Sequence, residues 1–147
     1  EETVNEYCRL ISEAFDACVN GKPMPDADGT DLPESLKKNY KAVLLQLQTP
    51  NLSRFLAVDV RPLLPQITCP VLALNGTKDI QVNHETNLEA LRNGLSGNTA
   101  DMIQEVVGAN HLFQHCSTGR VNEYKEIEET ISPEVLSAMI TWISNLK

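Results

Sequence analysis

An aspartate and a histidine each follow an apolar segment of this sequence. Asp79 comes shortly after the apolar run 69–75, and His111 comes shortly after a second run at 101–107. Because the carboxyl ends of parallel strands meet at one edge of a sheet, the two side chains are expected to lie side by side, where α/β proteins place their chemistry. A carboxylate can orient an imidazole and balance its charge while the imidazole acts as a general base. We interpret the pair as two thirds of a catalytic triad whose nucleophile is not in this chain.

The elements that would position this pair form a strand, a helix and a second strand. The run 69–75 is short and apolar without polar alternation, which favours a strand covered on both faces, and 101–107 is the second strand. Between them, 83–94 has leucines at helical spacing and begins with Asn83, a favoured N-cap residue. The sequence therefore predicts a βαβ unit, whose crossover is right-handed in nearly all known cases.

Further helices are predicted on both sides of this unit. They are expected at 1–20, 33–48, 51–58 and 133–146, with a surface loop at 22–32 and an extended connector at 59–66. The last helix is expected to turn its apolar residues inward, namely Val135, Leu136, Met139, Ile140 and Ile143. Together with the two parallel strands, these helices place the chain in the α/β class.

The predicted sheet is incomplete. Two parallel strands leave one hydrogen-bonding edge open on each side, and no internal repeat or low-complexity tract replaces the missing strands. The sequence therefore predicts the C-terminal part of a larger domain. Isolated material is expected to self-associate through the open edge of the 69–75 strand, or to be held by a companion chain.

The order of short motifs from about residue 59 onward resembles the C-terminal part of bacterial α/β-hydrolases. The motifs are Arg61-Pro62-Leu63-Leu64, the strand 69–75, Gly76-Thr77-Lys78-Asp79-Ile80-Gln81-Val82, Asn87-Leu88-Glu89-Ala90-Leu91 and Asn110-His111-Leu112-Phe113. The esterase and serine-aminopeptidase-like branch is the most similar. The resemblance implies a helical cap with linking helices at 1–60. It also implies the last two parallel core strands with their flanking helices at 61–147.

The same resemblance implies a triad in the order nucleophile, acid, histidine, with Asp79 as the acid and His111 as the base. When whole, the enzyme would cleave an ester or amide bond of a small molecule or peptide through an acyl-enzyme, without a metal or organic cofactor. The Gly-x-Ser-x-Gly segment is missing. Its nearest imitation, Gly94-Leu95-Ser96-Gly97-Asn98, lies between a helix and a strand, whereas a nucleophile elbow needs a strand followed by a helix. The 147 residues alone are therefore expected to lack turnover.

Three other hypotheses come from different classes of protein. A non-catalytic module that keeps the hydrolase framework for binding or subunit contact is the main alternative. A nucleotide-binding domain is disfavoured because Gly-x-Gly-x-x-Gly is missing after the first strand. A metal site built from His111, His115 and Cys116 is disfavoured because the zincin pattern needs glutamate at position 112, which is leucine.

Composition narrows the range of partners. A net charge of −8 argues against nucleic acid and against an anionic membrane surface, because both attract clustered cations. No apolar run approaches the ~20 residues needed to span a bilayer. The cysteines Cys8, Cys18, Cys69 and Cys116 have no framework spacing and are expected to be buried thiols, while Phe55, Leu56 and Trp142 are expected to pack in the core.

Overall fold

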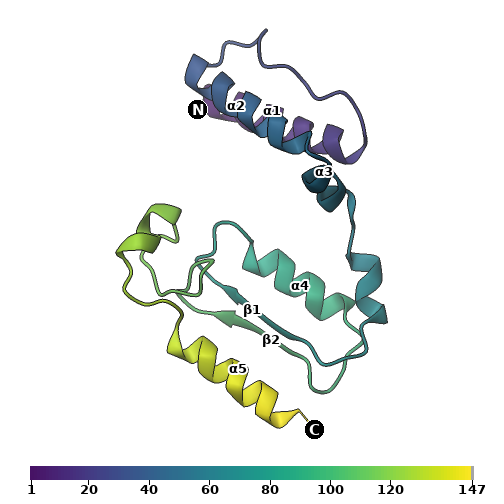
Figure 1. Ribbon diagram of the computed structural model, residues 1–147, viewed down its shortest axis with the longest axis vertical. Helices are drawn as coiled ribbons and strands as arrows, with labels where there is room; N and C mark the ends of the chain where they lie inside the picture. The colour runs from purple at the N-terminus through teal and green to yellow at the C-terminus, as the bar shows by residue number, and fades with distance from the viewer. Residues whose placement is uncertain (147) are drawn as a thin grey trace. The chain divides into compact units, whose positions relative to one another are not determined.

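The computed structural model describes residues 1–146, which form two units (Figure 1). Unit 1, Glu1–Asp59, holds α1 (Glu2–Val19), α2 (Glu34–Leu47) and α3 (Pro50–Ala57). Unit 2, Val60–Lys147, holds the 3-10 helix η1 (Arg61–Gln66), β1 (Leu72–Gly76), α4 (His84–Gly94), β2 (Met102–Val106), the 3-10 helix η2 (Val121–Glu126) and α5 (Pro133–Asn145). The assignment of these units to a cap and a hydrolase core stays a prediction.

Unit 1 is built from three helices around one apolar core. Apolar residues at helical spacing in α1 form a stripe that packs on α2 and α3. The buried residues are Leu10, Ala14, Ala27, Leu32, Tyr40 and Leu47. The Tyr40 hydroxyl donates to the carbonyl oxygen of Pro25 at 2.8 Å, which fixes the loop between α1 and α2 against the core. α2 ends at Leu47, as predicted, because the residue before Pro50 avoids the helical region.

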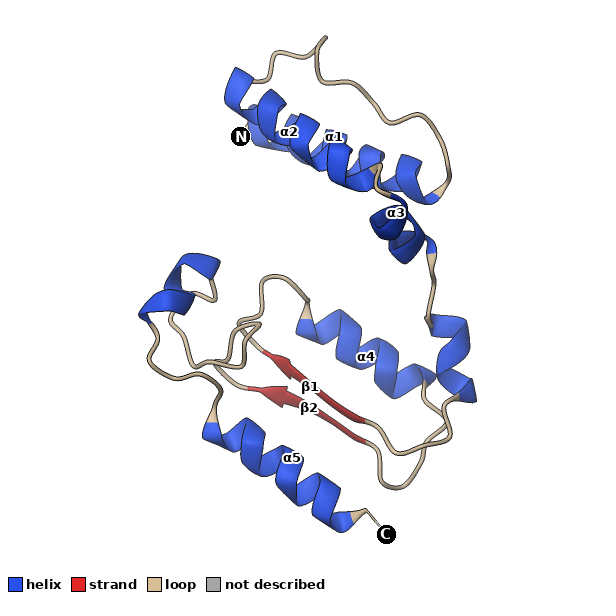
Figure 2. Cartoon of the chain, viewed as in Figure 1, coloured by secondary structure: helices blue, strands red, loops and turns tan. Residues whose placement is uncertain are grey.

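Unit 2 is centred on a parallel pair of strands, which within residues 1–146 is the whole sheet. The register runs from Leu72 opposite Met102 to Gly76 opposite Val106. α4 packs on both strands, α5 contacts β1, and Figures 1 and 2 show these two helices on opposite sides of the sheet. The predicted βαβ unit and the broad α/β class are therefore confirmed.

Some predicted boundaries were wrong for local reasons. β1 begins at Leu72 rather than at residue 69, because Pro70 has no N–H and the amide of Val71 donates to the Asp101 side chain at 2.9 Å. The connector 59–66 is not extended: Arg61–Gln66 forms a 3-10 helix with a proline at its start, where the fixed φ of proline is compatible with a tight helix.

The predicted burial of thiols and large apolar side chains was also partly wrong. All four cysteines are free, but Cys8 and Cys69 are exposed and the other two are half-buried. Phe55 is exposed, and Trp142 is half-buried with its indole N–H donating to the Ala100 carbonyl oxygen at 2.7 Å. Helical periodicity identifies an apolar stripe, but burial also needs a second surface to cover it.

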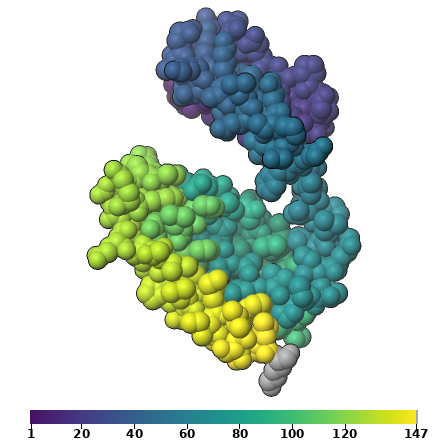
Figure 3. Space-filling model, viewed as in Figure 1, coloured from purple at the N-terminus to yellow at the C-terminus, as the bar shows by residue number. Residues whose placement is uncertain are grey.

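The same correction applies to α5, which lies at the surface of unit 2 and is yellow in Figure 3. Only Val135 of its predicted inward residues is buried. Four others, Leu136, Met139, Ile140 and Ile143, are between 41% and 66% exposed. Two strands spaced about 4.8 Å apart are narrower than the apolar stripe of a helix about 10 Å across, so part of α5 stays uncovered.

Candidate functional site

Asp79 and His111 lie together at the carboxyl edge of the sheet. Asp79 follows the end of β1 and His111 follows the end of β2. The carboxylate Oδ2 of Asp79 is 2.9 Å from Nδ1 of His111. The Asp79 side chain is only 4% exposed, whereas the His111 side chain is 40% exposed. The structure thus places a buried carboxylate behind an accessible imidazole.

The Asp79 carboxylate is held by its own turn. Oδ1 accepts the backbone N–H groups of Gln81 at 2.8 Å and Val82 at 2.9 Å, and Oδ2 accepts the side-chain amide of Asn75 at 3.1 Å. The Asn75 amide also donates to the Val82 carbonyl oxygen at 3.4 Å. These bonds fix the orientation of the carboxylate before any partner binds.

The charge of Asp79 follows from these contacts. Burial raises the pKa of Asp79, but hydrogen bonds from the Val82 amide, from His111 and from the Gln81 amide outweigh burial, so the net pKa is lowered. The carboxylate is therefore ionised at neutral pH and only accepts hydrogen bonds. Nδ1 of His111 consequently carries the proton, and the neutral ring keeps its lone pair on Nε2. Within residues 1–146, no hydrogen bond reaches Nε2.

A compact turn presents His111. The fully buried Asn110 accepts the backbone N–H groups of Leu112 at 2.9 Å and Gln114 at 3.0 Å through its side-chain oxygen. Its side-chain amide donates to the Gln114 side-chain oxygen at 3.0 Å. Phe113 adopts φ 58°, a conformation that a bulky residue rarely takes, so this network holds the turn in an unfavourable shape.

The turn after β1 and the loop after β2 are joined directly. The Lys78 N–H donates to the Ala109 carbonyl oxygen at 2.9 Å, and the Gly108 N–H donates to the Thr77 hydroxyl oxygen at 2.8 Å. A side chain at Gly76 would overlap the Ala109 carbonyl oxygen, so glycine is required there. The sequence pattern predicted no role for Asn75, Thr77 or Asn110. For Asn75 and Thr77, their position as polar residues at the end of the apolar strand β1 was a usable signal.

His115 belongs to a different cluster. Its Nδ1 lies 3.2 Å from Glu129 Oε2, and its Nε2 lies 3.4 Å from Glu134 Oε1. Cys116 instead places its thiol 3.5 Å from the Gly108 carbonyl oxygen. In the part of the chain that the structure describes, no group of three or more His, Cys, Asp or Glu side chains is arranged to hold a metal ion.

Ser96, whose flanking residues come nearest to the Gly-x-Ser-x-Gly pattern, lies away from the carboxyl edge of the sheet. It sits between α4 and the start of β2, and therefore near the amino ends of the strands. Its hydroxyl donates to the Ile67 carbonyl oxygen at 2.7 Å. Ser96 thus has a structural partner at the opposite edge from His111.

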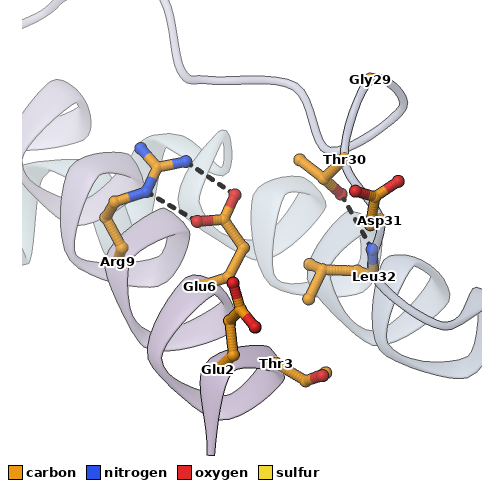
Figure 4. A pocket seen from close by; sticks show the side chains of 8 residues that line it. All are labelled: Glu2, Thr3, Glu6, Arg9, Gly29, Thr30, Asp31 and Leu32. Carbon is orange, nitrogen blue, oxygen red and sulfur yellow. Dashed lines mark hydrogen bonds and ion pairs between the residues drawn. The ribbon is translucent and has the colours of Figure 1, made fainter.

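A hollow of about 600 Å³ lies in unit 1 and contains neither Asp79 nor His111 (Figure 4). Its lining residues are Glu2, Thr3, Glu6, Arg9, Gly29, Thr30, Asp31 and Leu32. The Arg9 guanidinium is already paired with Glu6 at 2.8 Å and with Glu13 at 2.6 Å. The one cation in this hollow is therefore neutralised, which removes the usual basis for binding an anion there.

The lowered pKa of Asp79 predicts an acid-dependent stability. A carboxylate with a lowered folded-state pKa stabilises the protein above its unfolded pKa, about 3.9, and this stabilisation is lost as the pH falls through the folded pKa. Below a pH of about 4, the unfolding free energy should fall more steeply in the wild type than in Asp79→Asn. Urea unfolding followed by the fluorescence of Trp142, the single tryptophan, measures this in unit 2.

Asp31→Asn removes the same charge from unit 1 and is the control. This variant should leave the pH dependence of the Trp142 transition as in the wild type. Parallel pH profiles for Asp79→Asn and the wild type would contradict an ionised, hydrogen-bonded Asp79.

Two further findings complete the description. Among the helices of residues 1–146, none is long and apolar enough to cross a membrane. No protein-family model, curated protein or solved structure matches the chain.

Proposed function

We propose that this chain supplies the acid and the base of a serine hydrolase of the α/β-hydrolase type. One observation carries the proposal: the 2.9 Å contact between Asp79 and His111 at the carboxyl edge of two parallel strands. The order of acid before histidine along the chain matches that fold's triad. In the esterase and peptidase-like chemistry that the motifs imply, the substrate is an ester or an amide.

In this mechanism, Nε2 of His111 takes the proton of a serine hydroxyl as the serine oxygen attacks the substrate carbonyl carbon. Asp79 stabilises the imidazolium that forms and keeps the proton on Nδ1. His111 then gives its Nε2 proton to the leaving group, which departs. In the second half of the reaction, Nε2 takes a proton from water as the water oxygen attacks the acyl carbon, and then returns that proton to the serine oxygen as the acid product is released. The serine and the donors that stabilise the oxyanion come from a segment outside these 147 residues.

The different exposure of the two side chains suits these roles. A positioning carboxylate works best when it is shielded from water, since water weakens its hydrogen bond to the imidazole. A general base must reach the proton that it abstracts. Asp79 is shielded and Nε2 of His111 is open, which supports catalysis over the alternative of a non-catalytic binding module.

The test uses a fluorophosphonate, which reacts covalently with activated serines. A longer native polypeptide that contains this chain should be labelled at a serine in a Gly-x-Ser-x-Gly segment upstream of residue 1. The 147 residues alone should not be labelled. A folded longer polypeptide that has no such segment, or that takes up no label, would refute the hydrolase proposal and favour the binding module.

A further inference from the structure

Asn75 places a polar side chain near the end of the otherwise apolar strand β1. Its backbone lies opposite Glu105 in the register of the sheet, so the position of the residue is set by strand pairing. The residue is only 8% exposed. A buried amide without hydrogen-bond partners destabilises a fold, so both donors of this side chain need acceptors nearby.

The Asn75 amide nitrogen has two acceptors. It donates to Oδ2 of Asp79 at 3.1 Å and to the Val82 carbonyl oxygen at 3.4 Å. An ionised carboxylate and a carbonyl oxygen can only accept hydrogen bonds. The amide nitrogen, rather than the amide oxygen, must therefore face them, which fixes the orientation of the side chain.

With Asn75 in place, the Asp79 carboxylate has four hydrogen-bond donors. Oδ1 accepts the backbone N–H groups of Gln81 and Val82. Oδ2 accepts the Asn75 amide and the ring N–H of His111. A carboxylate has about four lone-pair sites, so these donors leave no site for water. The turn that carries Asp79 holds Oδ1, and the amide from β1 holds Oδ2 beside the imidazole.

Asn75 holds the carboxylate without neutralising it. A lysine or arginine in its place would form an ion pair with Asp79 and weaken the attraction of the carboxylate for an imidazolium. The ammonium group of Lys78, the residue before Asp79, is directed instead at two backbone carbonyl oxygens, at 2.8 and 3.0 Å. The charge of Asp79 is thus left to face His111.

We propose that Asn75 is a positioning residue of this site: its amide holds Oδ2 of Asp79 against Nδ1 of His111 and thereby keeps Nε2 as the open base. The part that this plays in catalysis rests on the proposed hydrolase function. Without the amide, Oδ2 gains a free lone pair and the carboxylate can turn about its Cβ–Cγ bond. The hydrogen bond that keeps the proton on Nδ1 then weakens, and the tautomer with the proton on Nε2 becomes more populated.

The tautomer of His111 measures this role in the 147-residue chain itself. Nitrogen-15 NMR distinguishes protonated from unprotonated ring nitrogens, and the spectrum is taken at a pH high enough that the His111 signals no longer change. Asn75→Leu keeps a side chain of similar size but has no donor. In this variant, the ratio of the Nδ1–H to the Nε2–H tautomer should fall about fivefold.

Three further variants define the result. Asp79→Asn should itself move the proton toward Nε2. Adding Asn75→Leu to Asp79→Asn should change the ratio no further, because the carboxylate through which Asn75 acts is gone. Asn98→Leu is the matched control, since the Asn98 amide also donates to a backbone carbonyl oxygen in unit 2, that of Thr68 at 3.0 Å. Its tautomer ratio should be that of the wild type.

Each other outcome overturns the proposal. An unchanged ratio in a folded Asn75→Leu variant would leave Asn75 a structural role alone. Asn75→Val, with a residue that strands favour, takes its place if Trp142 fluorescence shows that Asn75→Leu is unfolded, and loss of the fold in both variants would lead to the same conclusion. An equal fall in Asn98→Leu, or a further fall in the double variant, would show that the effect does not pass through Asp79.

Labelling of the longer polypeptide separates this inference from the hydrolase proposal. Asn75→Leu should slow fluorophosphonate labelling about fivefold, whereas Asn98→Leu should be labelled at the wild-type rate. A wild type that takes up no label would refute the hydrolase proposal and leave the tautomer result standing. If the wild type is labelled and Asn75→Leu is labelled equally fast, Asn75 is not a positioning residue for the reaction.

Discussion

Replacing His111 with alanine is expected to slow fluorophosphonate labelling of the longer, serine-bearing polypeptide by about 10⁴-fold or more. A serine hydroxyl is a weak nucleophile until a base takes its proton, and in the proposed mechanism that base is Nε2 of the accessible His111. Asp79→Asn should slow labelling by about 10⁴-fold, because an amide in place of the carboxylate favours the wrong imidazole tautomer. The rate of label incorporation measures both effects.

His115→Ala is the matched control for this experiment. His115 is also an exposed histidine beside a carboxylate, and it lies in the same loop, but its partners are Glu129 and Glu134. The variant should be labelled at nearly the wild-type rate. Comparable losses in the His111 and His115 variants, with Trp142 fluorescence unchanged in both, would show that neither histidine is the specific base.

The second large effect is expected on stability. Replacing Gly119 with alanine should reduce the unfolding free energy of unit 2 by about 3 kcal/mol or more. Gly119 has φ +76°, a conformation that costs an alanine about 1–2 kcal/mol. In addition, the new Cβ would overlap the Lys78 carbonyl oxygen, so the backbone at one of the two positions must move.

Gly97→Ala separates these two contributions. Gly97 has nearly the same φ, +78°, but no atom lies within 4 Å of the position that a Cβ would occupy. In this variant, the unfolding free energy should fall only by the cost of placing an alanine at positive φ, about 1–2 kcal/mol. Urea unfolding followed by Trp142 fluorescence gives both values. Equal losses in the two variants would show that the contact between Gly119 and Lys78 is not tight.

The Gly119 contact also bears on the site. Lys78 directly precedes Asp79, and its ammonium group donates to the carbonyl oxygens of Cys116 at 2.8 Å and Ser117 at 3.0 Å. A displaced Lys78 backbone would move the Asp79 turn relative to the loop that carries His111. Loss of labelling in Gly119→Ala should therefore exceed the loss that its lower stability explains.

The parts of the fold that follow from local patterns were predictable from the sequence. An apolar run without polar alternation indicated β1, the apolar residues within 101–107 indicated β2, and helical spacing between the two indicated α4. Asn83 was predicted as an N-cap, and its side chain accepts the Thr86 N–H at 2.9 Å. Because two parallel strands end at one edge, the closeness of Asp79 and His111 also followed from the sequence.

The features that depend on contacts between distant segments were not predictable in the same way. Apolar periodicity in α5 could not show that the sheet beneath it is only two strands wide in the described residues. The role of Asn110 depends on a turn whose shape is visible only in the folded chain. The prolines in η1 are compatible with both an extended connector and a 3-10 helix. Their number alone therefore did not predict which of the two conformations the segment adopts.

The bond between Asp79 and His111 also couples the site to the order of folding. The two residues are 32 positions apart, and the bond that joins them requires β1 and β2 to be already aligned. Closing such a long loop is slow relative to forming α4, because chain entropy is lost before the strands gain contacts. During synthesis, the contact between Asp79 and His111 cannot form until the ribosome has released His111. In the proposed mechanism, the oriented base would therefore form late, together with the pairing of β1 and β2.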